Sequence, residues 1–284
     1  MEVRRGDGTV IAVEVAGEPG GRPVLFCHGL ADSRLSVHPF APAARKLGLR
    51  LVAPDRPGIG GTDPRRLGRL ADWVEDAALV LDALDAGPAA VLGVSAGGSF
   101  AAACAARLPG RVRSLTLVSA LGPPGWPTGG MASGQRLALQ PARHAPAFSG
   151  WFLGRLAALA RRSPELFRRV ATSEMPGADR HAIGQPGMRD AFLAGYVEAF
   201  RRGSGGVAQD LRVLTRPWGF ELGSIMVPVF IHHGQADTTV PPQHARLFAQ
   251  VIPAAQLRLY PGHGHLSILS AAHEILAPLG HGWT

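Results

Sequence analysis

A chain of 284 residues is long enough for one large domain or two ordinary ones, and 46% hydrophobic residues can bury a large core. No run of twenty apolar residues occurs, so no transmembrane helix is indicated, and residues 1–6 lack the apolar segment of a signal peptide. We therefore expect a cytoplasmic protein. The two cysteines, Cys27 and Cys104, lie in apolar runs and are expected to be buried thiols.

The net charge of +8 is concentrated in one segment. Residues 122–218 contain 13 Arg and 6 Asp or Glu, so this segment carries +7 of the total. Arginine pairs such as Arg161-Arg162 are typical of solvated helix faces; an anionic substrate or partner is the alternative interpretation. No nucleic-acid-binding motif is present, so we predict no nucleic-acid partner.

The first part of the chain alternates short apolar runs with helical patterns. The pattern predicts a hairpin around residues 6–8, strands at 23–27, 49–53 and 112–119, and helices at 38–47 and 70–86. His28-Gly29 follows the strand at 23–27, and we interpret His28 as a residue that orients this loop. Arg56 is expected to pair with Asp55 or with a neighbouring loop. Gly58-x-Gly60 opens no helix directly, so no dinucleotide cofactor is predicted.

A serine motif, Gly93-x-Ser95-x-Gly97, lies between an apolar run at 89–92 and an Ala-rich helical pattern at 99–108. A strand that turns directly into a helix strains the backbone of the turning residue. Glycines on both sides remove the Cβ atoms that would clash there, so the serine hydroxyl is lifted clear of the sheet. The free N–H groups at the helix start point to the same place, where an oxyanion would form.

From residue 122 the alternation ends. Residues 122–127 are a Pro- and Gly-rich linker, and the pattern after it predicts helices at 151–162, 165–171 and 188–201. Apolar strands return at 227–231 and 257–260, with helices expected at 242–251 and 267–279. Asp237 follows the first of these strands and His265 the second.

The chain order Ser95, Asp237, His265 and the surrounding motifs closely resemble the α/β-hydrolase superfamily, in its serine-nucleophile branch with a helical cap. The resemblance covers nearly the whole chain. It implies an α/β-hydrolase fold, with a mostly parallel central sheet and flanking helices. The core would comprise residues 1–121 and 219–284, and residues 122–218 would form the cap over the active site.

The resemblance also implies roles for individual residues. Ser95 would attack a carbonyl carbon, His265 would take its proton, and Asp237 would orient the imidazole. The backbone N–H groups of Leu30 and Ala96 would hold the oxyanion. Cap aromatics are candidates to line the substrate pocket: Trp151, Phe152, Phe192, Tyr196 and Trp218 in the first place, and also Phe148.

These residues predict a serine hydrolase that cleaves an ester of a small, mainly apolar substrate without cofactor or metal. Alternatives on the same triad are a carbon–carbon-bond hydrolase, a lactonase, a thioesterase and a perhydrolase; a non-hydrolytic ligand-binding or biosynthetic accessory protein is a different class. His263 is the rival base, and a metal bound by His232, His233, His263 and His265 is a further alternative, although this spacing matches no familiar site. The sequence does not indicate an oligomeric state.

Overall fold

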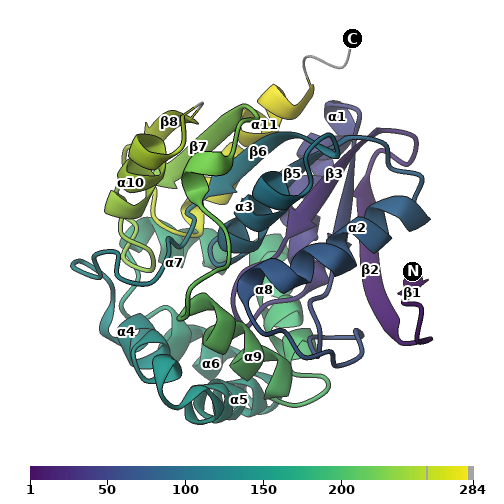
Figure 1. Ribbon diagram of the computed structural model, residues 1–284. Helices are drawn as coiled ribbons and strands as arrows, with labels where there is room; N and C mark the ends of the chain where they lie inside the picture. Colours follow the sequence, from purple (N-terminus) through teal and green to yellow (C-terminus); the bar gives the residue numbers. More distant parts are fainter. Residues whose placement is uncertain (254, 281–284) are drawn as a thin grey trace.

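The computed structural model describes residues 1–253 and 255–280, and its centre is an eight-stranded sheet (Figure 1). The strand order is β1-β2-β4-β3-β5-β6-β7-β8. β1 pairs antiparallel with β2, and β2 antiparallel with β4; all other pairs are parallel, which confirms the predicted α/β-hydrolase sheet. The strands are β1 (Glu2–Arg4), β2 (Val10–Gly17), β3 (Arg22–Cys27), β4 (Leu49–Pro54), β5 (Ala89–Val94), β6 (Val112–Val118), β7 (Val229–Gly234) and β8 (Ala255–Tyr260).

The parallel register brings the candidate site loops to one edge of the sheet. Cys27 at the end of β3 lies opposite Gly93 of β5, so the loop after β3 begins beside the serine motif. Gly234 at the end of β7 lies opposite Tyr260 at the end of β8. The loops that carry Asp237 and His265 therefore leave neighbouring strand ends, as expected where parallel strands terminate together.

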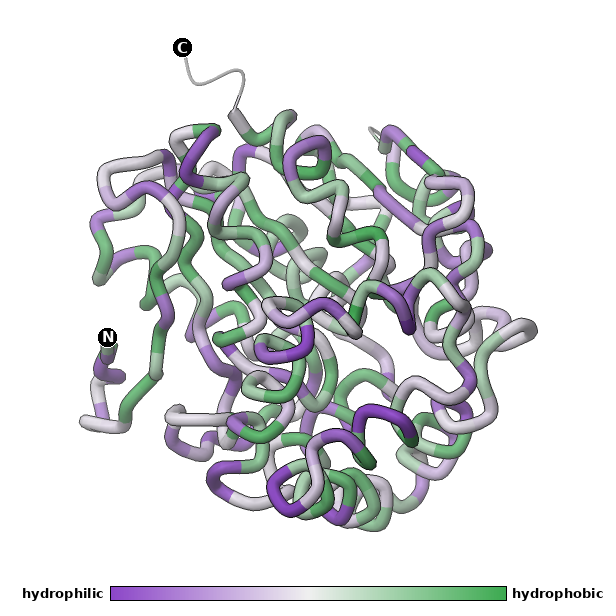
Figure 2. The backbone as a smooth tube through the Cα atoms, turned by 180° about the vertical axis from the view of Figure 1, so that it is seen from behind, coloured by the Kyte–Doolittle hydropathy of each residue, from purple (hydrophilic) through white to green (hydrophobic). Residues whose placement is uncertain are grey.

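Apolar side chains on both faces of the sheet pack against helices. The strands are therefore nearly continuous apolar runs (Figure 2). On one face Leu25 and Val91 join a cluster with Trp73 and Phe100. On the other face Val24 joins a cluster with residues of α1 (Ala41–Lys46) and α11 (Ala272–Leu276). Cys27 and Cys104 are buried free thiols, as predicted. The core helices are η1 (Arg34–Phe40), α1 (Ala41–Lys46), η2 (Leu70–Trp73), α2 (Val74–Ala83), α3 (Gly97–Arg107), η4 (Leu222–Ser224), α10 (Gln243–Val251), η5 (Ser267–Ala271), α11 (Ala272–Leu276) and η6 (Ala277–Gly280).

The single helix predicted for residues 38–47 is wrong in detail. The segment is a 3₁₀-helix, η1, followed by the short α-helix α1. Pro39 and Pro42 lack the N–H groups that a continuous α-helix would need here, which explains the break.

Between β6 and β7 the described chain forms only helices, and we call residues 122–218 the helical insert. Figure 1 shows α4, α5, α6 and α9 grouped together on one side of the sheet. The boundaries at 122 and 218 stay a prediction. The helices are α4 (Ser133–Leu139), η3 (Pro141–Arg143), α5 (Pro146–Arg162), α6 (Pro164–Ala171), α7 (Gly177–Gly184), α8 (Pro186–Ala199) and α9 (Gly205–Leu214). Within the described residues no helix is both long and apolar enough to cross a membrane.

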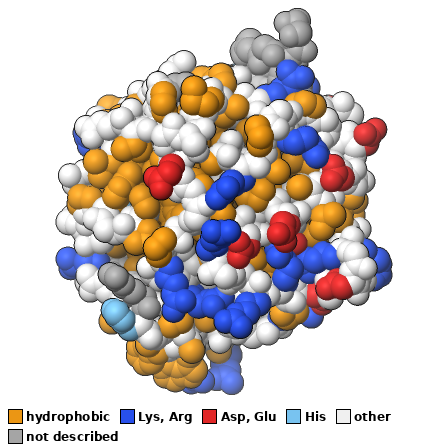
Figure 3. Space-filling model, in the orientation of Figure 1, with side chains coloured by type: hydrophobic (Ala, Val, Ile, Leu, Met, Phe, Trp, Pro, Cys, Tyr) orange, Lys and Arg blue, Asp and Glu red, His pale blue; other side chains and the backbone are white. Residues whose placement is uncertain are grey.

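The positive charge of the insert lies at the surface. Of its 13 arginines, the 12 whose side chains are described are all exposed or partly exposed. Figure 3 shows Lys and Arg side chains across this face of the molecule, with acidic side chains among them. The arrangement is the one expected of solvated helix faces.

Candidate active site

Ser95 occupies the turn between β5 and α3. Its φ of 56° lies in the left-handed region, which is uncommon for a residue with a side chain. Its N–H donates to the Val118 carbonyl at 2.9 Å, which ties the turn to β6. A Cβ on Gly97 would collide with the carbonyl oxygen of Cys27, so this glycine lets α3 begin directly against the end of β3. The strained turn therefore follows from close packing of its neighbours.

His265 and Asp237 form a buried pair: Nδ1 of His265 lies 2.8 Å from Oδ2 of Asp237. The other carboxylate oxygen accepts the N–H groups of Thr239 and Val240 at 2.8 and 2.9 Å, which fixes the carboxylate. Burial alone would raise the pKa of Asp237, but the rings of His265 and His233 outweigh burial and hold it well below its usual range. Burial alone would lower the pKa of His265, but the Asp237 carboxylate outweighs burial and raises it.

Asp179, a buried carboxylate on α7, binds the loop that carries His265. Its Oδ2 accepts the N–H of His265 at 2.8 Å. Its Oδ1 accepts the N–H groups of Leu266 and Ser267 at 3.1 and 2.8 Å, and the Ser267 hydroxyl at 2.7 Å. A side chain on Gly264 would collide with this carboxylate. Asp179 could not be predicted from the sequence, because it lies 86 positions before His265 and no local pattern connects the two residues.

Arg56 supports the loop after β3. It donates to the carbonyls of His28 and Gly29 at 2.7 and 2.8 Å, and it forms a buried ion pair with Asp210 of α9 at 2.7 Å. Of the two expected partners, the neighbouring loop is therefore the one observed; Asp55 pairs with another arginine. Burial of His28 lowers the pKa of its ring well below the usual value, and its Nδ1 lies 3.0 Å from the Gly29 carbonyl.

A cavity of about 440 Å³ lies between the sheet edge and the insert. Ser95, His265, Leu30 and Ala96 all line it, so the structure brings the candidate nucleophile, base and oxyanion donors to one space. Asp237 lies behind His265. Whether these groups perform the expected roles stays a prediction.

Three of the expected pocket aromatics line this cavity: Phe152, Phe192 and Tyr196. Trp151 and Trp218, expected at the pocket, lie elsewhere. Trp151 is 56% exposed on the outer face of α5, where it stacks on Phe148, because adjacent residues of a helix point about 100° apart. Trp218 is buried in the core, where its Nε1–H donates to the Leu214 carbonyl at 3.2 Å.

The cavity is mostly apolar, and Phe167, which the sequence analysis did not name, lies in its wall with its ring 4.7 Å from that of Tyr196. Besides His265, the charged side chains along it are Asp32 and Glu174, both acidic. No lysine or arginine of the described residues lines it. The electrostatics of the cavity are therefore opposite to the positive surface of the insert.

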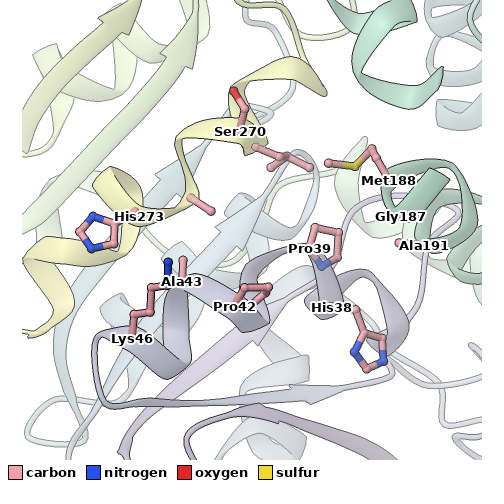
Figure 4. A pocket seen from close by; sticks show the side chains of 12 residues that line it. His38, Pro39, Pro42, Ala43, Lys46, Gly187, Met188, Ala191, Ser270 and His273 are labelled. Atoms are coloured by element: carbon pink, nitrogen blue, oxygen red, sulfur yellow. The ribbon is translucent and has the colours of Figure 1, made fainter. Parts of the chain in front are cut away.

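A second, more open hollow of about 560 Å³ adjoins the cavity (Figure 4). Its walls come from η1 and α1, the start of α8, and η5 and α11, with labelled residues that include His38, Lys46 and Met188. Leu269 lines both spaces. None of the candidate reacting groups lines this hollow, so it is not the candidate active site.

Of the other histidines, only His233 among the described residues also contacts the Asp237 carboxylate: its Nε2 lies 3.2 Å from Oδ2, the oxygen that His265 contacts. Nδ1 of His263 lies 3.1 Å from the Ser267 carbonyl, and His263 does not line the cavity. His232 Nδ1 lies 2.8 Å from the Tyr260 hydroxyl, and His233 Nε2 lies 2.9 Å from the Val240 carbonyl. Over the described ranges, no group of three or more His, Cys, Asp or Glu side chains is arranged to hold a metal.

The strand order and the strand–serine–helix turn together define an α/β protein of the hydrolase class. A family model for the alpha/beta hydrolase fold matches residues 22–272, and the chain belongs to that family. It is accordingly an enzyme, a hydrolase of the α/β type.

Relatives and solved structures agree with this assignment. A poly(3-hydroxyalkanoate) depolymerase from Ectopseudomonas oleovorans is 31% identical, over 93% of this chain and 84% of its own. A 2-hydroxymuconate semialdehyde hydrolase from Pseudomonas putida is 29% identical, over 89% and 84%. An esterase from Exiguobacterium antarcticum has a TM-score of 0.72 at 21% identity, over 99% of both chains, which is a likeness of fold.

Proposed function

We propose that this hydrolase is a serine esterase that forms an acyl-enzyme on Ser95. One observation carries the proposal: a serine with a left-handed backbone and a histidine bonded to a buried aspartate line the same mainly apolar cavity. A serine hydroxyl is a poor nucleophile by itself, and this arrangement supplies the base that it needs.

In the proposed mechanism His265 takes the Ser95 proton as the oxygen attacks the ester carbonyl, and then gives it to the leaving alcohol. Asp237 keeps the Nδ1 proton in place and stabilises the imidazolium that forms; the raised pKa of His265 expresses that stabilisation. The N–H groups of Leu30 and Ala96 hold the oxyanion, assisted by the N-terminus of α3. Water then hydrolyses the acyl-enzyme by the same route.

The cavity walls support a small substrate that is mainly apolar and not anionic. Leu153, Phe152, Phe167 and Phe192 offer apolar surface, and the acidic lining would repel a carboxylate. The depolymerase relative acts, by its name, on a polymer of hydroxy acids, whose units are joined by esters.

Cleavage of a carbon–carbon bond is the second candidate, because one relative is a 2-hydroxymuconate semialdehyde hydrolase. The name of that substrate denotes a carboxylate, and a carboxylate is normally bound by arginine or lysine. Since no such side chain of the described residues lines the cavity, the ester is favoured. Lactones, thioesters and perhydrolysis are further substrates and reactions that the same groups could serve.

We further propose that residues 122–218 act as a cap. Asp179 of the insert binds the loop of His265 directly, and Asp210 pairs with Arg56, which in turn binds the loop of Leu30. These contacts support a closed arrangement over Ser95. A cap would exclude bulk water and provide the specificity walls.

A fluorophosphonate probe tests the proposal, because it labels only an activated serine. We expect stoichiometric labelling of the wild-type chain and none of Ser95→Ala, together with hydrolysis of short-chain nitrophenyl esters by the wild type alone. Matched neutral and carboxylate-bearing esters, compared at low and high salt, then test the substrate class. Labelling that persists in Ser95→Ala, or a strong preference for the carboxylate that falls with salt, would contradict the proposal.

A further inference from the structure

One charged side chain of the cavity has no part in the proposed Ser95 chemistry. Asp32 lies in the loop between β3 and η1, is partly exposed and lines the cavity. The position that a Cβ would take on Gly29 lies 3.6 Å from the Ser95 Cβ and 3.9 Å from the Asp32 Cβ. The Cβ atoms of Ser95 and Asp32 are therefore less than 8 Å apart. Both residues line the same cavity, so a substrate attacked by Ser95 occupies a space whose wall includes Asp32.

The carboxyl group of Asp32 is held on two sides. Its Oδ1 accepts the N–H of Ser33 at 2.8 Å. A Cβ on Gly195 of α8 would collide with the same oxygen, so the helix backbone packs directly against it. A side chain fixed in this way is already oriented for binding and loses little further freedom when a ligand arrives.

The arginines nearest to Asp32 in the described chain are paired with other carboxylates. Arg34 pairs with Asp55 and Glu198, and Arg56 pairs with Asp210. Among the arginine and lysine side chains that the structure describes, none forms an ion pair with Asp32. A carboxylate at an apolar wall with spare acceptor capacity is costly, and a ligand that donates a hydrogen bond to it recovers part of that cost.

Burial raises the pKa of Asp32 to about 6, against the Ser33 N–H, the Ser36 hydroxyl and the charge of Arg56; Asp55 adds to the rise. The other titratable or charged groups around it are His265 and Glu174 in the cavity and the Arg34–Glu198 pair at η1 and α8. Above pH 6 the group is therefore mainly an anionic hydrogen-bond acceptor.

We propose that Asp32 forms a substrate subsite for a hydrogen-bond donor, a hydroxyl or amino group that stands a few bonds from the carbonyl attacked by Ser95. The inference rests on the proposed esterase function and narrows its substrate class from apolar esters to esters with one such donor. The apolar walls would hold the rest of the substrate, and the donor would fix its register relative to Ser95.

The test compares nitrophenyl esters of butanoate, 3-hydroxybutanoate and 3-aminobutanoate. For the wild type we expect kcat/KM for at least one substituted ester to exceed that for butanoate by about tenfold at pH 7.5, the effect of one charge-assisted hydrogen bond. The substituted ester with the larger preference identifies the donor. A ratio near one for both substituted esters would overturn the inference.

Two variants separate Asp32 from the rest of the cavity. Asp32→Asn removes the charge but keeps an oxygen for the Ser33 N–H, so the preference should fall several-fold; Asp32→Leu should abolish it. Glu174→Gln removes the other acidic group of the cavity and should keep the preference. Because each result is a ratio of two substrates on one enzyme, a general loss of activity cancels. An unchanged ratio in Asp32→Leu, with circular dichroism showing a folded protein, would overturn the inference.

The pH dependence gives an independent measurement. The wild-type ratio should rise with pH through about 6 as Asp32 ionises, and it should be flat in Asp32→Asn. Titration of His265 affects both esters equally and cancels. A wild-type ratio that does not change with pH, or one that rises equally in Asp32→Asn, would contradict the assignment.

Binding to Ser95→Ala separates this inference from the proposed function. By calorimetry, Ser95→Ala should bind the substituted ester that the wild type prefers about tenfold more tightly than the butanoate ester, and it should not hydrolyse either ester. The wild type could hydrolyse the butanoate ester while neither the kcat/KM ratio nor the binding measurement favours a substituted ester. That result would refute the Asp32 subsite and leave the esterase proposal standing. If no ester is hydrolysed and the binding preference is present, the esterase proposal fails and the subsite stands.

Discussion

The sheet core and the helical insert contribute different things to the cavity. The core carries the candidate reacting groups on loops at neighbouring strand ends, where the register fixes their positions. The insert carries apolar walls and, in addition, buried carboxylates that bind backbone groups or an arginine of the core. The difference shows that the insert is more than a cover: Asp179 binds the loop of His265, and Asp210 pairs with the arginine that binds the loop of Leu30.

The two buried carboxylates of the insert, Asp210 and Asp179, each anchor a loop of the core, but through different partners. Asp210 is neutralised by the Arg56 guanidinium, which in turn holds the His28 and Gly29 carbonyls. Asp179 accepts only N–H and O–H groups from the loop of His265. An ion pair therefore anchors the loop of Leu30. Hydrogen bonds from N–H and O–H groups to a carboxylate anchor the loop of His265.

The largest expected effect lies in the core. His265→Ala should lower kcat/KM for a nitrophenyl ester by about 10⁴-fold or more, because members of a triad act as a unit. His263→Ala is the matched control; its ring contacts the Ser267 carbonyl outside the cavity, so the rate should stay within a few-fold of wild type. Steady-state kinetics of both variants check this, and the reverse order would show that the base is misassigned.

The next effect concerns the ion pair that joins insert and core. Asp210→Asn leaves the buried Arg56 charge uncompensated and should lower the free energy of unfolding by about 3–5 kcal/mol. Urea unfolding measures it. Asp190→Asn on the exposed face of α8 is the control, and it should change the free energy of unfolding by less than about 0.5 kcal/mol. Equal effects of the two variants would contradict the anchoring role of Asp210.

Asp179 should affect both rate and pH dependence. Asp179→Ala removes the acceptor of three N–H groups, so the loop of His265 should loosen and kcat fall by about 10–100-fold. Asp179→Asn keeps one acceptor oxygen and loses the negative charge. That charge, together with Asp237, raises the pKa of His265. The His265 pKa should then fall, so the acidic limb of the kcat/KM profile should move to lower pH.

Two controls distinguish this from a purely structural role. A loss of stability alone would lower activity without moving the acidic limb, so an unmoved limb in Asp179→Asn would contradict the electrostatic part. Asp190→Asn, on the same insert, should leave the limb in place.

Sequence reasoning was successful where the local pattern decides the structure. The Ser95 turn, the strands and the family follow from glycine spacing, apolar runs and motif order, and the sheet and the family are confirmed. It was less successful in the insert. Helices α4, α7 and α9 were not predicted; α9 begins with two glycines and is stabilised by burying Val207 and Leu211, a tertiary effect.

Buried polar partners could not be predicted for the same reason. Asp179 and Asp210 contact residues 86 and 154 positions away, and no local pattern distinguishes them from exposed aspartates such as Asp190. The triad candidates could be named because a known motif order connects them across the chain. The walls of the cavity were predicted only in part. The sequence identifies the aromatic residues of the insert, but it does not show which of them lie on the helix faces that line the cavity.

The smallest expected effect tests those helix faces with two adjacent residues. Phe152 lines the cavity and Trp151, the preceding residue of α5, is exposed. Phe152→Ala should raise KM for a butanoate ester by roughly tenfold and shift the preference toward longer acyl chains, because the wall recedes by the volume of one ring. Trp151→Ala should leave both KM and the chain-length profile within about twofold of wild type, since it removes only surface exposed to solvent. A chain-length series of nitrophenyl esters measures both variants. Equal shifts of KM in the two variants would contradict the assignment of Phe152, rather than Trp151, to the cavity wall.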